Sequence, residues 1–293
     1  MFSPFSFFHQ PEFPTDGLFL RWKADTFVQT SGTDVIAWTA SYASASLTDA
    51  QKTLTPTGIV QGSSPQTYAT QSIKPQYITS SANFNSKPTV DFPISGSSNL
   101  TAAKLWTSLT DVTSNSLSGS AYWSIAYIMK PHFTGSVVFA DEDIYLGSMW
   151  AGNDVQKGFD NSIGLVLTVY DGTNRVNLLR GGAFPATGEV SSSIATTTNP
   201  QVLVNTYQFG NEADFGEGFI NNSANIYDYD NGTIPATPTS QSFWMYTGQS
   251  YYSNRVNDRN YAMEVAEIVV WKKKLDAGEL TILQNYASAS YGI

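Results

Sequence analysis

The stretch from Tyr261 to Ile293 carries the clearest pattern of hydrophobic and polar positions in the chain. Residues 261–270 are rich in β-branched and aromatic side chains, which predicts a central strand buried on one face and flanked by strands on both sides. Asp276 and Glu279 have the spacing of a capping box, so a helix is predicted to begin there. Its apolar stripe consists of Leu280, Leu283, Tyr286 and Ala287, and Gly292 is predicted to end the helix. One late helix should therefore dock on a sheet.

Short runs of strand-forming residues, separated by turn residues, occupy most of the chain. One of the stronger hairpin signals is Asp171-Gly172, and an acidic turn at residues 141–143 is predicted to join another hairpin. The predicted strands are residues 17–24, 35–38, 89–92, 122–130 (ended by Pro131), 137–140, 144–147, 163–170, 175–179, 202–209, 218–221, 226–229, 243–247 and 261–270. This spacing predicts an all-β fold in which two antiparallel sheets pack face to face.

Three further segments have other patterns. Residues 40–86 are dominated by small polar side chains and interrupted by prolines, which predicts a long surface loop. Residues 105–109, with Leu105, Trp106 and Leu109, indicate a helical turn. The pentapeptide Tyr-Ala-Ser-Ala-Ser occurs at residues 42–46 and 286–290 in different surroundings, and we interpret it as a chance repeat.

The N-terminal segment is unlike the rest of the chain. Residues 1–14 contain three prolines and have neither helical nor alternating periodicity, so residues 1–16 are predicted to form an extended arm ahead of a domain at residues 17–293. Its phenylalanines are too apolar to remain in water, so they are candidates for anchoring the chain to a neighbouring subunit; the alternative is a strap over the same chain. These residues are Phe2, Phe5, Phe7, Phe8 and Phe13.

Composition excludes several classes of function. Charged residues make up 13% of the chain and the formal net charge is -9, which would repel a phosphate backbone, so nucleic acid is not an expected partner. No cysteine occurs, which excludes disulfides and thiolate chemistry. No apolar run has the length of a membrane span, and residues 1–14 lack the basic start of a secretory signal.

Several motifs follow one another in an order that resembles a known family. The residues that carry the likeness are Gly17 to Asp25, Trp38, Lys74, Pro75, Lys87 to Phe92, Ala266 to Trp271, Leu275, Asp276, Glu279 and Tyr291 to Ile293. In this order they resemble the concanavalin A-like, laminin-G-like jelly-roll domains of bacterial and bacteriophage surface proteins. The resemblance implies a two-sheet antiparallel jelly-roll sandwich with one C-terminal helix, and it implies a structural role for Glu267.

The sequence contains few residues in the spacings that catalytic sites require. Glucanases of this fold use a Glu-x-Asp-x-x-Glu strand motif for their nucleophile and acid, and that spacing does not occur here. Glu264 and Glu267 are three residues apart, which in a regular strand puts them on opposite faces, with one facing solvent. With only His9 and His132, a histidine-zinc site or a Ser-His-Asp triad is not expected. The sequence therefore predicts that the protein is not an enzyme.

The sequence predicts no cofactor. A bound calcium ion is the alternative. Residues 141–143 are interpreted as a solvated acidic turn rather than a cation site. The segment 228–232, with Asp228, Asp230, Asn231 and Gly232, resembles a calcium loop, but its glycine comes one position early and no glutamate follows at the twelfth position. The basic run Lys272 to Lys274 is interpreted as a solvated turn rather than an anion site.

Aromatic residues in predicted loops are the candidates for glycan binding. Trp150, Tyr251 and Tyr252 could stack on the apolar faces of sugar rings, although loop aromatics in a jelly roll also cap the core or contact a partner subunit.

The predicted function is that of a non-enzymatic bacteriophage virion structural protein with a surface-displayed adhesion module, as in a tail fibre or receptor-binding protein. It would be made in the host cytoplasm and displayed on the virion surface. Its expected partners are other virion proteins, further copies of itself and a host cell-surface glycan; membrane insertion is not expected. The alternatives are a capsid decoration protein and a free bacterial carbohydrate-binding protein or glycosidase.

Overall fold

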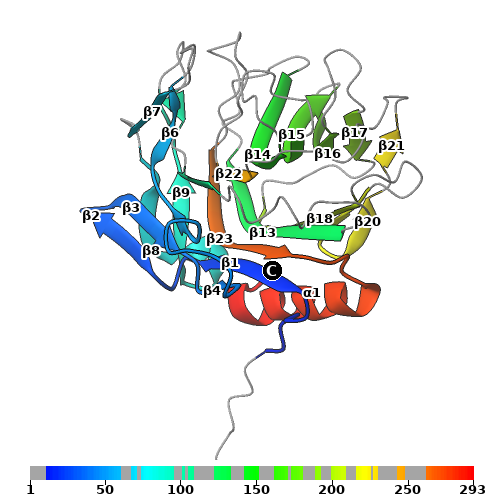
Figure 1. Cartoon of the computed structure of the whole chain (residues 1–293). Coiled ribbons are helices and arrows are strands. Elements are labelled where there is room, and N and C mark those ends of the chain that lie inside the picture. Colours follow the sequence, from blue (N-terminus) through cyan, green and yellow to red (C-terminus); the bar gives the residue numbers. More distant parts are fainter. Residues whose placement is uncertain are drawn as a thin grey trace, which may run out of the picture.

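The computed structural model describes residues 11–60, 67–70, 74–95, 101–102, 105–108, 122–132, 142–151, 162–170, 173–180, 189–192, 199–208, 216–225, 227–229, 243–247 and 262–293. In this part of the chain two antiparallel sheets and one C-terminal helix form an all-β sandwich, as predicted. Figure 1 shows the larger sheet lying between the smaller sheet and the helix α1.

The larger sheet has twelve strands within the described ranges. They are β1 (Leu18–Lys23), β2 (Val28–Ser31), β3 (Asp34–Thr39), β4 (Tyr42–Ala43), β5 (Thr53–Leu54), β8 (Gln76–Ser81), β9 (Lys87–Phe92), β13 (Tyr122–His132), β18 (Gln201–Gln208), β19 (Gly216–Ile220), β20 (Ser223–Asn225) and β23 (Ala262–Trp271). The predicted last strand, β23, is central, since β1 and β9 pair with one of its edges and β13 with the other.

The smaller sheet has seven strands in the part of the chain that the structure describes. They are β12 (Leu105–Ser108), β14 (Glu142–Ala151), β15 (Ser162–Tyr170), β16 (Thr173–Arg180), β17 (Glu189–Ser192), β21 (Tyr227–Tyr229) and β22 (Phe243–Thr247). Two short hairpins lie outside both sheets: β6 (Thr57–Val60) with β7 (Thr67–Thr70), and β10 (Ile94–Ser95) with β11 (Thr101–Ala102). The hairpin predicted at Asp171-Gly172 is confirmed, because Tyr170 of β15 pairs with Thr173 of β16.

Alternation along the strands divides the buried residues between the two faces of the larger sheet. Leu20 and Trp22 of β1, with Trp123 and Tyr127 of β13, belong to the core that also contains Leu105 of β12. The opposite face forms a second core beneath α1 (Ala277–Tyr291) and the short 3-10 helix η1 (Ala82–Phe84). That second core includes Phe84, Val269, Trp271, Leu280, Leu283 and Tyr291. The larger sheet is thus buried on both faces.

The helix begins and ends as the sequence predicts. The Asp276 carboxylate accepts a hydrogen bond from the backbone N–H of Glu279 at 2.9 Å, and the Glu279 carboxylate accepts one from the backbone N–H of Asp276 at 3.1 Å. Gly292 ends the helix with φ +74°, a left-handed conformation that glycine adopts without a steric penalty. None of the helices in the described ranges has the length and hydrophobicity that a membrane span requires.

A β-bulge in β23 overturns the prediction that the two glutamates of that strand face opposite ways. Ile128 pairs with Glu267 and Met129 with Val265, so Ala266 is an extra residue in the ladder. The alternation therefore shifts by one position, and Glu264 and Glu267 both face η1 and α1. Neither reaches solvent, since their exposed fractions are 2% and 0%.

Four other predicted features differ in the structure. Residues 40–86 contain β8 and the buried residues Leu47, Leu54 and Phe84, so they are not simply a surface loop. The predicted helical turn at residues 105–109 is strand β12 at residues 105–108. Strand β13 continues through Pro131, which pairs with Met263. Glu142 and Asp143 lie inside β14 rather than in a turn.

Candidate functional site

A buried carboxylate joins the first strand, the last strand and the helix. The Glu267 carboxylate accepts a hydrogen bond from Arg21 Nε through one oxygen, and hydrogen bonds from the hydroxyls of Tyr286 (2.9 Å) and Tyr291 (2.7 Å) through the other. The Glu267 side chain is fully buried and that of Arg21 is 16% exposed. A buried charge of this kind is tolerable because it is paired and fully hydrogen-bonded.

The electrostatics of this cluster keep the arginine charged and the tyrosines neutral. Burial has the largest single effect and lowers the pKa of Arg21, but the Glu267 carboxylate, together with Tyr286 and Tyr291, more than offsets it, so the pKa of Arg21 is raised. Burial, followed by the charge of Glu267, raises the pKa of both Tyr286 and Tyr291 well above the usual value for a phenol. Both phenols therefore remain hydrogen-bond donors to Glu267 at neutral pH.

Glu264, the second buried glutamate, is also held by hydrogen bonds from neighbouring side chains. Glu264 accepts hydrogen bonds from Thr89 Oγ1 at 2.7 Å and from Asn83 Nδ2 at 2.8 Å. Asn83 in turn accepts a hydrogen bond from Lys130 Nζ at 2.8 Å. This cluster ties η1 to β9, β13 and β23.

The start of the described chain crosses the outer face of the larger sheet as a strap, residues 11–16. Phe13 stacks on Trp271 (ring centroids 6.0 Å apart) and meets Tyr286 edge-on at 5.0 Å. The Pro14 carbonyl accepts a hydrogen bond from Trp271 Nε1 at 2.9 Å. Phe13 therefore packs within its own chain, as the alternative of a strap over the same chain predicts, and its anchoring of a neighbouring subunit stays a prediction. Phe2, Phe5, Phe7 and Phe8 lie outside the described residues.

A groove of about 470 Å³ opens between the strap, β1, the turn after η1 and the C-terminal end of α1. This volume falls within the roughly 300–1,000 Å³ typical of ligand pockets. We call it the basic groove; it is lined by Pro11, Phe13, Arg21, Lys23, Asp25, Asn85, Lys87, Tyr286, Ala289, Ser290 and Tyr291.

Strand alternation explains why two of these cations share the groove. Arg21 and Lys23 alternate along β1 with Leu20, Trp22 and Ala24, which are buried in the core on the other face. The Arg21 guanidinium lies over the Phe13 ring, 3.5 Å from its centroid, and 5.0 Å from the centroid of the Tyr286 ring. These two rings and the Glu267 carboxylate hold the guanidinium in one orientation.

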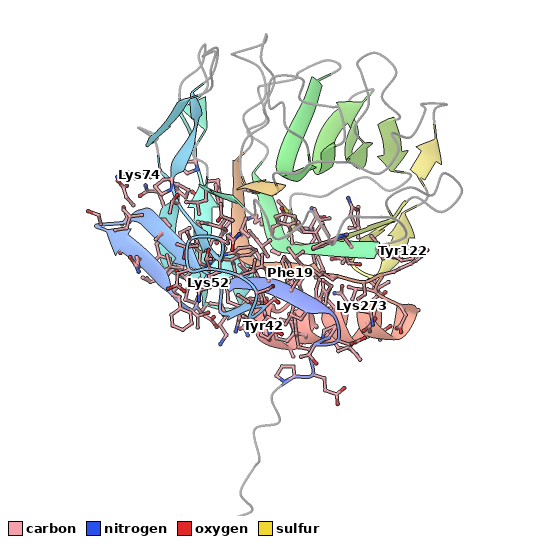
Figure 2. All side chains as sticks on the ribbon, viewed as in Figure 1. Phe19, Tyr42, Lys52, Lys74, Tyr122 and Lys273 are labelled. Carbon is pink, nitrogen blue, oxygen red and sulfur yellow. The ribbon has the colours of Figure 1, made fainter. Side chains whose placement is uncertain are left out.

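An exposed aromatic ring stands next to this arginine. In the pairing of β1 with β4, Tyr42 lies opposite Arg21, so the two side chains project from the same face of the sheet. Tyr42 is 46% exposed, and Figure 2 shows it at the lower margin of the sheet. The two copies of the Tyr-Ala-Ser-Ala-Ser repeat lie in different elements, β4 and α1, yet each places its tyrosine beside Arg21.

Of the three aromatic residues predicted to bind glycan, Trp150 lies in the described part of the chain. Trp150 is not in a loop; it lies within β14, opposite Ser162 of β15 and Trp244 of β22. Tyr251 and Tyr252 lie outside the described residues. Sequence reasoning also missed the basic groove, although the alternation of Arg21 and Lys23 between apolar neighbours was a usable signal.

The remaining candidate sites gain no support as binding sites. Lys273, from the basic run, binds Asp16 at 2.7 Å and Glu279 at 2.8 Å, joining the strap to the first turn of α1. Asp228 lies in β21, and residues 230–232 fall outside the described ranges. Among the residues that the structure describes, no group of three or more histidine, aspartate or glutamate side chains is placed to hold a metal ion.

Comparisons with known proteins agree on the fold. No protein-family model matches the chain, and no curated protein sequence does. Among solved structures, a tryptophan-to-alanine mutant of HCR/D gives a TM-score of 0.53 at 9% identity, covering 92% of this chain and 52% of that one. Botulinum neurotoxin type C, whose uptake into cells is described as dependent upon two ganglioside molecules, gives 0.51 at 12% identity, covering 93% of this chain and 51% of that one.

The chain thus spans about half the length of these structures. At such identities the likeness establishes a β-sandwich fold, and the fold alone hosts many functions.

Proposed function

We propose that this protein is a non-catalytic adhesion module of a bacteriophage virion, and that its basic groove binds saccharides on the host cell surface. The observation that carries the proposal is the groove itself, an open cavity of ligand size that combines fixed polar groups with aromatic rings. Sugar rings present hydroxyls to polar groups and apolar faces to flat side chains, and the groove region offers both. The exposed ring of Tyr42 beside Arg21 is the candidate stacking surface.

Binding is favoured over cleavage by the state of the two glutamates in β23. A glycosidase needs two carboxyl groups that face the substrate. Here every carboxylate oxygen of Glu264 and Glu267 accepts a hydrogen bond from the protein, and both side chains are buried. Neither is accessible to a sugar.

The virion setting is supported by the order of motifs between Gly17 and Ile293, which resembles that of jelly-roll domains in bacterial and bacteriophage surface proteins. Saccharide binding is in line with one structure of similar fold, that of botulinum neurotoxin type C, whose cell entry is dependent upon interaction with two ganglioside molecules. Capsid decoration is the second candidate, because the same motifs would suit a module displayed on a capsid.

A blocking substitution tests the groove without touching the core. Ala289 is exposed on α1 and lines the groove, so Ala289→Trp should fill it and weaken binding at least about tenfold, equivalent to about 1.4 kcal/mol. Ser288→Trp is the matched control, because Ser288 is the exposed neighbour on the same helix and does not line the groove. Affinities would be measured by calorimetry with oligosaccharides selected on a glycan array.

Three results would reject this function. Absence of saccharide binding by the folded chain, or equal loss of binding in both tryptophan variants, would remove the groove as a glycan site. Release of reducing sugar from a bound glycan would instead identify an enzyme. Antibodies against the chain test the proposed place on the virion, since they should label intact particles and block the adsorption of the particles to cells. Labelling without an effect on adsorption would favour capsid decoration.

A further inference from the structure

We infer that the ligand of the basic groove is an acidic saccharide that carries a carboxylate. This inference rests on the proposed function and adds the charge of the ligand. Three cations, Arg21, Lys23 and Lys87, line the groove. The buried Glu267 pairs with Arg21 and the exposed Asp25 with Lys23, which leaves an excess of one positive charge. The chain as a whole has a net charge of -9, so this local excess of positive charge runs against the composition.

Arg21 is positioned to recognise a carboxylate. A guanidinium has five N–H donors, and among the described residues only Nε of Arg21 has a hydrogen-bond acceptor, the Glu267 carboxylate. Its terminal nitrogens are left for a ligand, and the side chain keeps 16% of its surface exposed. Because Phe13 and Glu267 already fix the orientation of the guanidinium, little conformational entropy would be lost when a planar carboxylate binds it in a bidentate manner.

The two lysines extend this positive surface. Lys23 Nζ lies 3.2 Å from Asp25 Oδ2 in a partly exposed ion pair, which is weak in water. Lys87 is exposed and has no ion-pair partner in the described part of the chain. Asp25 can accept hydrogen bonds from sugar hydroxyls, so the groove can distinguish a sugar acid from a simple anion.

The test compares acidic oligosaccharides with the same molecules after reduction of each carboxyl group to a primary alcohol. The reduced sugars keep the rings and hydroxyls and lose only the charge. We expect the acidic form to bind roughly tenfold or more tightly, the range of a charge-assisted hydrogen bond. We also expect its affinity to fall as sodium chloride is raised, because the groove is open to solvent and its charges are screened.

Lysine variants test whether the basic groove is responsible for the preference for acidic saccharides. The double variant Lys23→Gln/Lys87→Gln should reduce the preference for the acidic form severalfold, while Arg21 retains part of it. Lys74→Gln is the control, because Lys74 also pairs with a partly exposed aspartate, Asp34, at 3.7 Å and has nearly the same side-chain exposure as Lys23, 26% against 24%. Figure 2 shows Lys74 at the edge of the sheet far from α1. Circular dichroism and thermal melts would confirm that each variant is folded.

The outcomes separate this inference from the proposed function. Equal affinity for acidic and reduced sugars would overturn the inference and leave saccharide binding intact, whereas no binding of either would overturn both. A preference for acids that the double lysine substitution leaves unchanged, or that Lys74→Gln reduces equally, would also overturn it. A preference that is reduced in the double variant alone supports it.

Discussion

Arg21 and Glu267 lie 246 positions apart in the chain and form an ion pair on the helix-covered face of the larger sheet. The register of β1 against β23 brings them together, since Lys23 pairs with Glu267 and Arg21 with Val269, which makes Arg21 a diagonal neighbour of the glutamate. Tyr286 and Tyr291 then attach α1 to the same carboxylate. One buried charge thus connects both ends of the domain and supports the wall of the basic groove.

Removing the arginine alone should be strongly destabilising. Arg21→Met leaves the Glu267 carboxylate buried without its cation, and we expect the free energy of unfolding to fall by about 3–5 kcal/mol. Urea denaturation followed by far-ultraviolet circular dichroism measures the change. The double variant Arg21→Met/Glu267→Leu should recover part of the loss because no unpaired charge remains. A double variant whose loss equals the sum of the two single losses would show that the pair is not coupled.

Alkaline pH should weaken the attachment of α1. In the unfolded chain the phenols of Tyr286 and Tyr291 lose their protons near the ordinary pKa of 10.0, whereas the folded protein raises both pKa values and retains the protons. Above that pH the unfolded state binds fewer protons, so the free energy of unfolding decreases as the pH rises. Urea unfolding between pH 8 and about pH 11 would detect this slope. In Tyr286→Phe/Tyr291→Phe the slope should be shallower; an unchanged slope would contradict the assignment.

Phe27 is held in a conformation that favours glycine. It has φ +54° in the turn between β1 and β2, and its side chain is 63% exposed. A left-handed conformation costs an L-residue with a Cβ about 1–2 kcal/mol, so Phe27→Gly should stabilise the protein by about 1 kcal/mol in urea denaturation. Phe27→Ala is the control, because it removes the ring and keeps the Cβ. Equal stabilisation by both substitutions would show that the exposed ring, not the backbone, is responsible.

The N-cap of α1 should contribute a measurable share of stability. Asp276→Ala removes the acceptor for the Glu279 N–H, and we expect a loss of about 1 kcal/mol. Asp276→Asn retains a capping oxygen and should lose much less, which thermal melts monitored by circular dichroism would show. If asparagine is as harmful as alanine, the charge of Asp276 matters more than its hydrogen bond.

The elements that depend on local chemistry could be predicted from the sequence. The capping box at Asp276 and Glu279, and the Asp171-Gly172 hairpin, are determined by residues close in the chain, and the structure has both. The central position of β23 could also be predicted, because a strand this rich in β-branched and aromatic residues is expected to have a neighbouring strand on each side. These features require no knowledge of distant contacts.

Features that depend on distant strands could not be predicted in this way. Pro131 was expected to end its strand, but in the described residues β18 pairs with β13 only as far as Met129, so the missing N–H of Pro131 is not needed on that side. The polar segment before β9 enters the larger sheet because β8 pairs with β9, which its composition does not reveal. Trp150 was assigned to a loop although β15 and β22 pair on either side of it.

The candidate site was predictable only in part. The alternation of Arg21 and Lys23 between apolar residues indicates that both side chains share a face of β1. Lys87 and Ala289 reach the same groove from β9 and α1, and nothing local in the sequence brings them to Arg21. A groove to which the strap, β1, β9 and α1 all contribute depends on tertiary packing.

The extra residue Ala266 has a practical consequence for finding relatives of this chain. It allows two carboxylates with an odd sequence separation to share one face of β23. A homologue whose last strand is regular would need an even separation for the same arrangement. Alignments should therefore permit a one-residue gap opposite Ala266, since an ungapped comparison would equate a buried acid in one protein with a core aliphatic residue in the other.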